Sequence, residues 1–198
     1  MSDAVVREWT RLLGSPVFDI TSSVSVAADG SIYLAGASMV EPGNLAGSNS
    51  SYLTKFNSDG SGGSENLLGS DFNGVPYSVK TAADGSIYIA GIGISYLEGQ
   101  PNGDIFVGKY NADGSPQWMD LLGSDNDEYM DSSESVALGT DGSIYIAGYT
   151  YGDLDGHANS GSSDAFIAKY RSDGSKEWTQ FIGSSSEERA TGVSAAAD

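Results

Sequence analysis

Asp-Gly-Ser-Ile-Tyr-Leu-Ala-Gly, at residues 29–36, is the stretch of sequence that decides the fold, because it returns almost unchanged at residues 84–91 and 141–148. Asp-Gly between two apolar segments is a strong signal for a β-hairpin, since the tight turn needs the positive φ that glycine adopts freely. Self-similarity at a nearly constant spacing indicates a repeat protein, and the spacings here are 55 and 57 residues.

Two other blocks recur in a fixed order around this stretch. Lys-Phe-Asn-Ser-Asp-Gly-Ser at residues 55–61 returns in variant form at 109–115 and 169–175, and Leu-Leu-Gly-Ser at 12–15 has counterparts at 67–70, 121–124 and 181–184. The sequence of each unit predicts four short strands, which we call a, b, c and d. One Asp-Gly turn joins a to b, and another joins c to d. Strand b is apolar on both faces, as expected for a sheet that is covered on both sides.

A four-stranded unit of this length is typical of a β-propeller blade. We therefore predict an all-β fold of β-propeller blades with four antiparallel strands each, about three and a half blades in a single repeat array over residues 1–198. The predicted elements are a lone strand d at 7–14, blade one at 22–69, blade two at 76–123, blade three at 134–183 and a lone strand a at 191–198. Outermost strands open with tryptophan (Trp9, Trp118 and Trp178), except in blade one, which has Ser64.

Three motifs carry a resemblance to a known family: Trp-Thr-x-x-x-Gly-Ser at residues 178–184, the Asp-Gly-Ser-Ile-Tyr-x-Ala-Gly stretch, and Asp-Ala-Phe-Ile-Ala-Lys-Tyr at 164–170. The pattern resembles the bacterial β-propeller repeats of the SBBP type, which are similar to NHL repeats. The resemblance implies a segment of a larger surface or secreted protein, and hence an extracellular or cell-surface location. No signal peptide is visible in the sequence, so a cytoplasmic location stays open.

Closed propellers usually have four to eight blades, so this sequence predicts an incomplete ring. Two interpretations are open. The sequence is a fragment of a longer protein, or it is a half-propeller that completes a ring as a homodimer through its terminal blades, whose unpaired strand edges favour association.

Composition excludes several function classes. The net charge is −18, which disfavours nucleic acids and anionic membranes as partners, and no apolar stretch is long enough to insert into a bilayer. There is no cysteine and one histidine, His157, so thiol chemistry, zinc sites and His-centred triads are not expected. We predict no catalytic residue, no enzyme activity and no required cofactor; a glycan-processing enzyme using paired carboxylates is the distant alternative.

The b–c and d–a loops differ between the units, and variable loops on a rigid scaffold are the usual place for binding sites. The sequence predicts an interaction or scaffold module, with a protein or glycan as partner, and a calcium-binding or carbohydrate-binding module as the alternative. Candidate calcium ligands are the loop acids Asp125, Asp127, Asp131, Asp153 and Asp155, although they match only part of a calcium-loop pattern. Candidate sugar-stacking residues are Tyr96, Tyr129, Tyr149 and Tyr151. The competing interpretations are solvated turn carboxylates and tyrosines that pack the loops.

A lysine recurs on strand c, as Lys55, Lys109 and Lys169. Asp104 and Asp164 precede it by five residues in two of the units. Three copies argue for a structural role, either a repeated ion pair or a side chain whose stem covers apolar surface.

Overall fold

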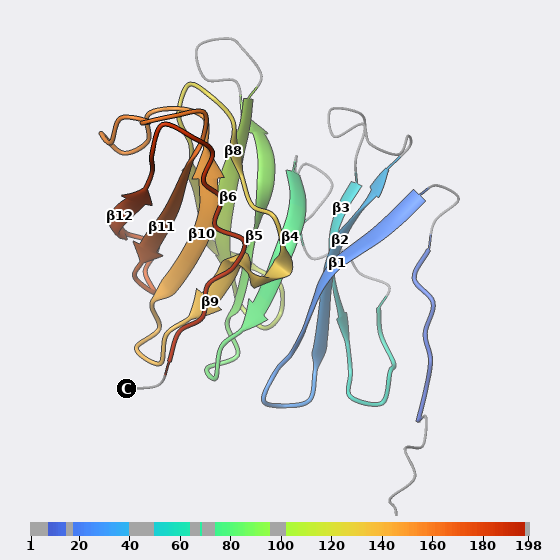
Figure 1. Cartoon of the computed structure of the whole chain (residues 1–198). Helices are drawn as coiled ribbons and strands as arrows, with labels where there is room; N and C mark the ends of the chain where they lie inside the picture. The colour runs from blue at the N-terminus through green and yellow to red at the C-terminus, as the bar shows by residue number, and fades with distance from the viewer. Residues whose placement is uncertain are drawn as a thin grey trace, which may run out of the picture.

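The computed structural model describes residues 8–14, 18–39, 50–63, 68, 74–95 and 102–196. Its strands form three antiparallel sheets that stand next to one another (Figure 1). The first sheet consists of β1 (Phe18–Val26), β2 (Ile32–Met39) and β3 (Ser50–Phe56). The second consists of β4 (Gly74–Thr81), β5 (Ile87–Ser95), β6 (Asn102–Tyr110) and β7 (Pro116–Leu122). The third consists of β8 (Glu128–Tyr129), β9 (Val136–Leu138), β10 (Ile144–Thr150), β11 (Asp164–Tyr170) and β12 (Lys176–Ile182).

Strand order within each sheet follows the chain, so every unit is a meander, as the repeats predict. In the third sheet strand a is divided, because β8 and β9 both pair with β10 and the 3-10 turn η2 (Ser133–Ser135) separates them. The innermost strands begin earlier than the predicted blades at 22, 76 and 134, at Phe18, Gly74 and Glu128. The prediction of an all-β fold of antiparallel sheets is confirmed.

The structure differs from the prediction at the two lone strands. Described residues 8–14 form no strand; Trp9 Nε1 and Arg11 Nε hold this segment by donating to the carbonyls of Ser58 (3.1 Å) and Gly60 (2.8 Å). Residues 191–196 also form no strand. Among the described residues, neither segment has another strand of its own unit with which it could form backbone hydrogen bonds. Of the predicted strand d of blade one, Ser64 lies outside the described residues, and the described residue Leu68 packs against the core of the first junction.

The Asp-Gly turns explain why the hairpins recur. Six turn glycines (Gly30, Gly60, Gly85, Gly114, Gly142 and Gly174) have φ between 77° and 90°, which side-chain-bearing residues rarely adopt. The aspartate before each glycine accepts a hydrogen bond from the backbone N–H of the serine two residues after it, and contacts with this serine hold the pKa of each aspartate below its usual value.

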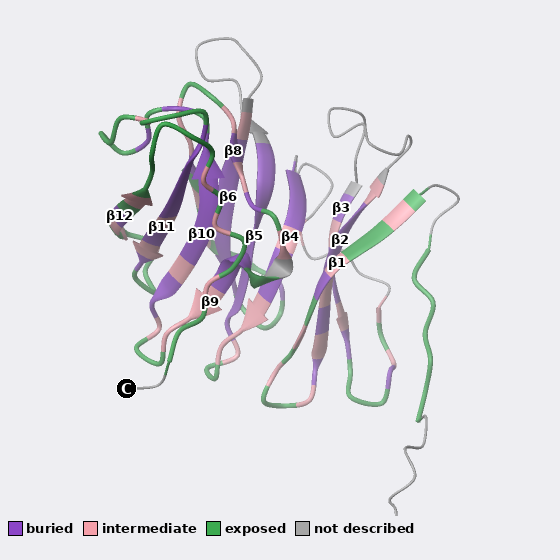
Figure 2. Ribbon diagram, in the orientation of Figure 1, coloured by how far each residue is buried: buried purple, intermediate pink, exposed green. Residues whose placement is uncertain are grey.

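The hydrophobic core lies between sheets. At the first junction Tyr33, Ala35 and Leu53 pack with Val79, Ile87, Ile89, Phe106 and Tyr110. The second junction repeats this pattern with Tyr88, Ala90, Ile105, Val107 and Leu122 against Val136, Ile144, Ile146, Phe166, Ala168 and Tyr170. The second sheet, with a neighbour on each face, is therefore mostly buried, whereas β1 is largely exposed (Figure 2). The second sheet thus presents one side to the preceding unit and the other side to the following one.

Candidate interaction surfaces

The d–a loop of the third unit is fixed by a buried carboxyl group. Glu128 has no exposed surface, and it accepts hydrogen bonds from the Ser124 hydroxyl (2.5 Å), the Ser124 N–H (2.9 Å) and the Thr150 hydroxyl (2.7 Å). Burial raises the pKa of Glu128 to about 7, against the opposing effect of these donors and with a further increase from the Asp104 carboxylate. Glu128 therefore joins the loop to β10.

Equivalent positions in the other units show that this bridge is optional. The paired positions are Glu128 and Thr150 in the third sheet, Asp19 and Ser38 in the first, and Gly74 and Gly93 in the second. The Ser38 hydroxyl donates to Asp19, so the first sheet has the same kind of bridge, while two glycines leave none in the second. Glu188 repeats the contact of Glu128 with a serine, since it accepts from the N–H of Ser184 at 2.8 Å.

Glu128 makes stability depend on pH. Its folded-state pKa of about 7 lies above the 4.5 of an ordinary glutamate, so its stabilising contribution is complete below about pH 4.5 and is lost as the pH rises through about 7. Between pH 5 and pH 8 we expect the free energy of unfolding to fall by about 2 kcal/mol, measured by urea denaturation. Glu128→Gln should abolish most of this fall, and Glu134→Gln, at an exposed position, should retain it. A fall of the same size in Glu128→Gln would contradict the assignment.

The predicted tyrosines do come together, but mainly against one another. Tyr129 and Tyr149 stack with ring centroids 5.4 Å apart, and Tyr151 meets each of them edge to face at 5.9 Å. The Arg189 guanidinium lies 4.6 Å from the centroid of Tyr149, which is buried. Loop packing therefore accounts for Tyr129 and Tyr149, and Tyr151 is the exposed member of this tyrosine cluster. Tyr96 lies outside the described residues.

Three of the five candidate calcium ligands, Asp127, Asp131 and Asp155, are in separate environments. Asp127 accepts from Gly103 N–H and from the Tyr129 hydroxyl, and Asp155 accepts from Lys176 and Thr179. Asp131 is exposed beside Tyr149, whose pKa is raised by burial and by this carboxylate. Within the described ranges no group of three or more His, Cys, Asp or Glu side chains could hold a metal ion.

Asp125 and Asp153 share a polar cleft on the loop side of the third sheet. The cleft has a volume of about 340 Å³ and is also lined by Ser124, Asn126, Tyr151 and Gly152. Both aspartates are exposed, and Asp153 accepts a hydrogen bond from the Asn159 N–H at 2.9 Å. This loop cleft is the place where predicted acidic and aromatic candidates meet.

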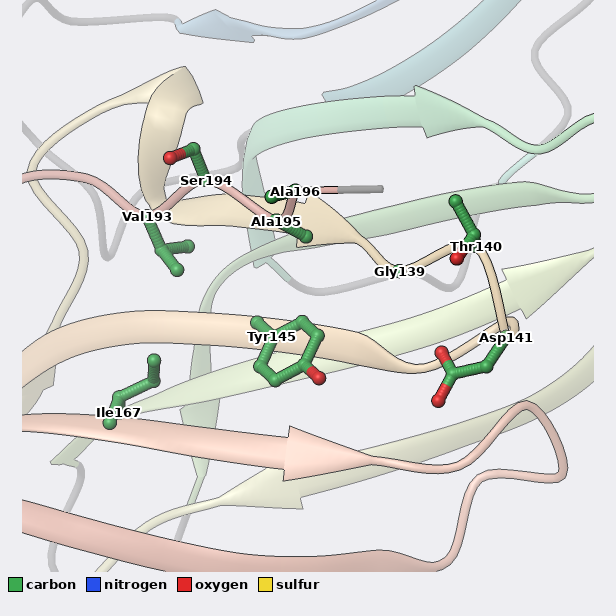
Figure 3. Close-up of a pocket in the computed structure, with 9 residues that line it drawn as sticks. All are labelled: Gly139, Thr140, Asp141, Tyr145, Ile167, Val193, Ser194, Ala195 and Ala196. Atoms are coloured by element: carbon green, nitrogen blue, oxygen red, sulfur yellow. The ribbon is translucent and has the colours of Figure 1, made fainter. Parts of the chain in front are cut away.

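A second cleft lies on the open side of the third sheet (Figure 3). Tyr145 of β10 and Ile167 of β11 line it from one side, and residues 193–196 run across the other, around a volume of about 350 Å³. Lys169 lies on the same face as Tyr145, with Nζ 5.7 Å from the centroid of the Tyr145 ring. On the first two sheets, Lys55 and Lys109 lie over Tyr33 and Tyr88 in the same way, each at 5.4 Å. The structure thus adds a cation–π contact to the predicted structural role of the lysine.

Sequence reasoning missed Glu128 and Arg189. Glu128 had a usable signal, because Gly-Ser-x-x-x-Glu occurs at both 123–128 and 183–188. Arg189 occurs once and reaches Tyr149 only through the tertiary fold, so no spacing could have indicated it. His157 is exposed and stacks on Phe181 with ring centroids 4.9 Å apart.

Comparison with known proteins agrees with the repeat. Residues 27–62 and 139–177 match the family model "Domain of unknown function (DUF5122) beta-propeller". The chain is also similar to Regulatory protein FlaEY of Caulobacter vibrioides, with 28% identity over 213 aligned residues that cover 94% of this chain and 22% of that protein. The described residues contain no helix that could cross a membrane. The two matched segments and the three antiparallel sheets show that this chain is built of β-propeller repeats.

Proposed function

We propose that this chain is a non-enzymatic interaction module, formed by β-propeller repeats of the SBBP type, that binds a partner through the loops beside the third sheet. The observation that carries the proposal is the fixed geometry of the loop cleft. Glu128 attaches one wall to β10, the tyrosine cluster supports the other, and Asp125, Asp153 and Tyr151 are left at the surface. A preorganised surface of this kind reduces the entropy that binding costs.

The negative charge of the chain and of the loop cleft favours one kind of partner. The chain carries a net charge of −18, and the two aspartates of the loop cleft are exposed. Electrostatic complementarity therefore favours a basic protein segment over a nucleic acid or an anionic surface. FlaEY, which is named a regulatory protein, is compatible with a module that acts through binding.

An array of basic peptides tests this proposal. We expect the double variant Asp125→Asn, Asp153→Asn to bind its best peptides at least about tenfold more weakly than the unchanged chain. The matched control Asp59→Asn, Asp113→Asn removes the same charge from two c–d turns, where asparagine can replace aspartate, and should bind normally. Equal weakening in both variants would mean that net charge alone is responsible and would contradict a site at the loop cleft.

A further inference from the structure

The buried carboxyl group of Glu128 lies behind the loop cleft and reaches both of its walls through hydroxyl groups. One wall is formed by residues 124–126 and the other by residues 151–153. Glu128 Oε1 contacts the Ser124 hydroxyl of the first wall at 2.5 Å, and it contacts the hydroxyl of Thr150, which directly precedes the second wall, at 2.7 Å. A single carboxyl oxygen therefore connects the two sides of the cleft.

Each of these hydroxyl groups is also bonded to the backbone of its own wall. The Ser124 hydroxyl oxygen accepts from the Asn126 N–H at 3.1 Å and lies 3.3 Å from the Asn126 carbonyl oxygen. The Thr150 hydroxyl oxygen accepts from the Gly152 N–H at 2.9 Å and lies 3.0 Å from the Gly152 carbonyl oxygen. The walls themselves touch, since a Cβ at Gly152 would lie 2.5 Å from the Ser124 hydroxyl oxygen. A change at Glu128 thus reaches the backbone of both walls.

The number of hydroxyl hydrogens shows what a proton on Glu128 does. The two hydroxyl groups make four contacts with acceptor oxygens, two with Glu128 Oε1 and one each with the carbonyls of Asn126 and Gly152. Each hydroxyl has one hydrogen to donate, so an ionised Glu128 leaves two of the four contacts without a hydrogen. A protonated carboxyl group supplies a third hydrogen and releases a hydroxyl to donate to a wall carbonyl. The neutral form therefore joins the walls more completely than the ionised form.

The surroundings of Glu128 also favour its neutral form. Glu128 has no exposed surface, and among the described residues no lysine, arginine or histidine forms an ion pair with it. On one side β6 places the buried Asp104 carboxylate near it, and on the other side β10 offers an uncharged threonine hydroxyl. Burial and the Asp104 carboxylate raise the pKa of Glu128 to about 7. The other acids of the two loops are Asp125, Asp127 and Asp153.

We propose that the proton of Glu128 is a switch for the loop cleft. With Glu128 neutral, the two walls are held together and the cleft binds its partner; with Glu128 ionised, the walls separate and binding weakens. An ionised carboxylate needs further donors, and because Glu128 has no exposed surface, water reaches it only when the walls part. The binding step rests on the proposed function, whereas the movement of the walls is a property of the chain alone.

NMR of the peptide-free chain from about pH 5.5 to about pH 8.5 tests the movement of the walls. We expect the Glu128 carboxyl carbon to titrate near pH 7 and the amide signals of Asn126 and Gly152 to shift with the same midpoint. In Glu128→Gln, these amide signals should be nearly independent of pH. Glu188→Gln is the matched control, because Glu188 binds Ser184 through the same Gly-Ser-x-x-x-Glu motif but does not lie behind the cleft. Its amide signals should titrate as in the unchanged chain.

Two further variants test the route from Glu128 to the walls. Thr150→Val keeps the shape of the side chain and removes its hydroxyl group, so the Gly152 amide should stop following pH while the Asn126 amide continues. Asp104→Asn should move the Glu128 midpoint to lower pH, because a repelling carboxylate is removed. An unchanged response of the Gly152 amide in Thr150→Val would contradict this route.

The affinity for basic peptides tests the effect of the switch on binding. Acetylated peptides that contain arginine and lysine but no histidine keep their own charge over this pH range. We expect their affinity to fall at least about fivefold between pH 6 and pH 8.5 in the unchanged chain and in Glu188→Gln, and to stay constant in Glu128→Gln.

Two outcomes would overturn the switch. One is tighter peptide binding at high pH, because the added negative charge of Glu128 would then decide affinity instead of the wall geometry. The other is a set of wall amide signals that stays fixed throughout the titration, even where peptides bind. Walls that move with the Glu128 titration in a chain that binds no basic peptide at any pH would support the movement and reject the proposed function.

Discussion

Phe106→Ala is expected to lower the free energy of unfolding by about 4 kcal/mol, in the range for removing a large buried aromatic side chain. Phe106 is 1% exposed and lies at the junction of the first two sheets, where it packs with residues of both. It also covers Gly91, its register partner on β5, so its loss opens space within the second sheet as well. Urea denaturation followed by far-ultraviolet circular dichroism measures the loss.

Leu121→Ala is the matched control. Leu121 is the register partner of Phe106 on β7 but is 53% exposed, so its truncation should change stability by no more than about 0.5 kcal/mol. Similar losses in the two variants would show that the core does not lie between the first two sheets.

Gly91→Val is expected to lower the free energy of unfolding by about 3 kcal/mol, because the added side chain overpacks the sheet. A Cβ at this position would lie 2.1 Å from the Val75 carbonyl oxygen and 2.9 Å from the Phe106 ring. The first of these atoms belongs to the backbone of β4, next to a register shift between Pro76 and Ser78, so it cannot move aside as a side chain can. The same glycine occurs as Gly36 and Gly148, opposite Tyr52 and Phe166.

Gly14→Val is a suitable comparison because the nearest atom to its added Cβ, a carboxylate oxygen of Asp19, is 3.8 Å away. We expect this replacement at an exposed position to lower the free energy of unfolding by no more than about 0.5 kcal/mol in the same urea experiment. A stable Gly91→Val protein would contradict the close packing of strands a and b that all three units share.

The sequence predicts the repeated part of this fold well, because each turn is specified locally. Asp-Gly-Ser sets the hairpins through glycine φ and a serine contact within two residues, so the turn needs no tertiary information. Residues 8–14 and 191–196 show the limit of that reasoning. Their sequences match strands of a unit, but a strand also needs a hydrogen-bonded neighbour, and sequence similarity does not supply one.

The candidate surfaces are less predictable, since they depend on what the tertiary fold brings together. The sequence predicts Tyr129, Tyr149 and Tyr151 as aromatic loop residues, and the fold does bring them together. Only the structure shows that Arg189 covers Tyr149, and that Asp127 and Asp155 already accept protein hydrogen bonds. Composition can identify residues that suit a ligand, but it cannot show which of them are already hydrogen-bonded or covered by other protein groups.

The difference between the two sides of each sheet gives the array a direction. One side offers a lysine donor with a tyrosine or tryptophan donor, and the other offers a hairpin carbonyl that is followed by an Asp-Gly turn, as at the contact of Trp118 with Ser172 and Gly174. Units can therefore follow one another in one sense only, as subunits do in a polar filament with two unlike ends. Turning one unit around would set donors against donors and acceptors against acceptors on its two sides.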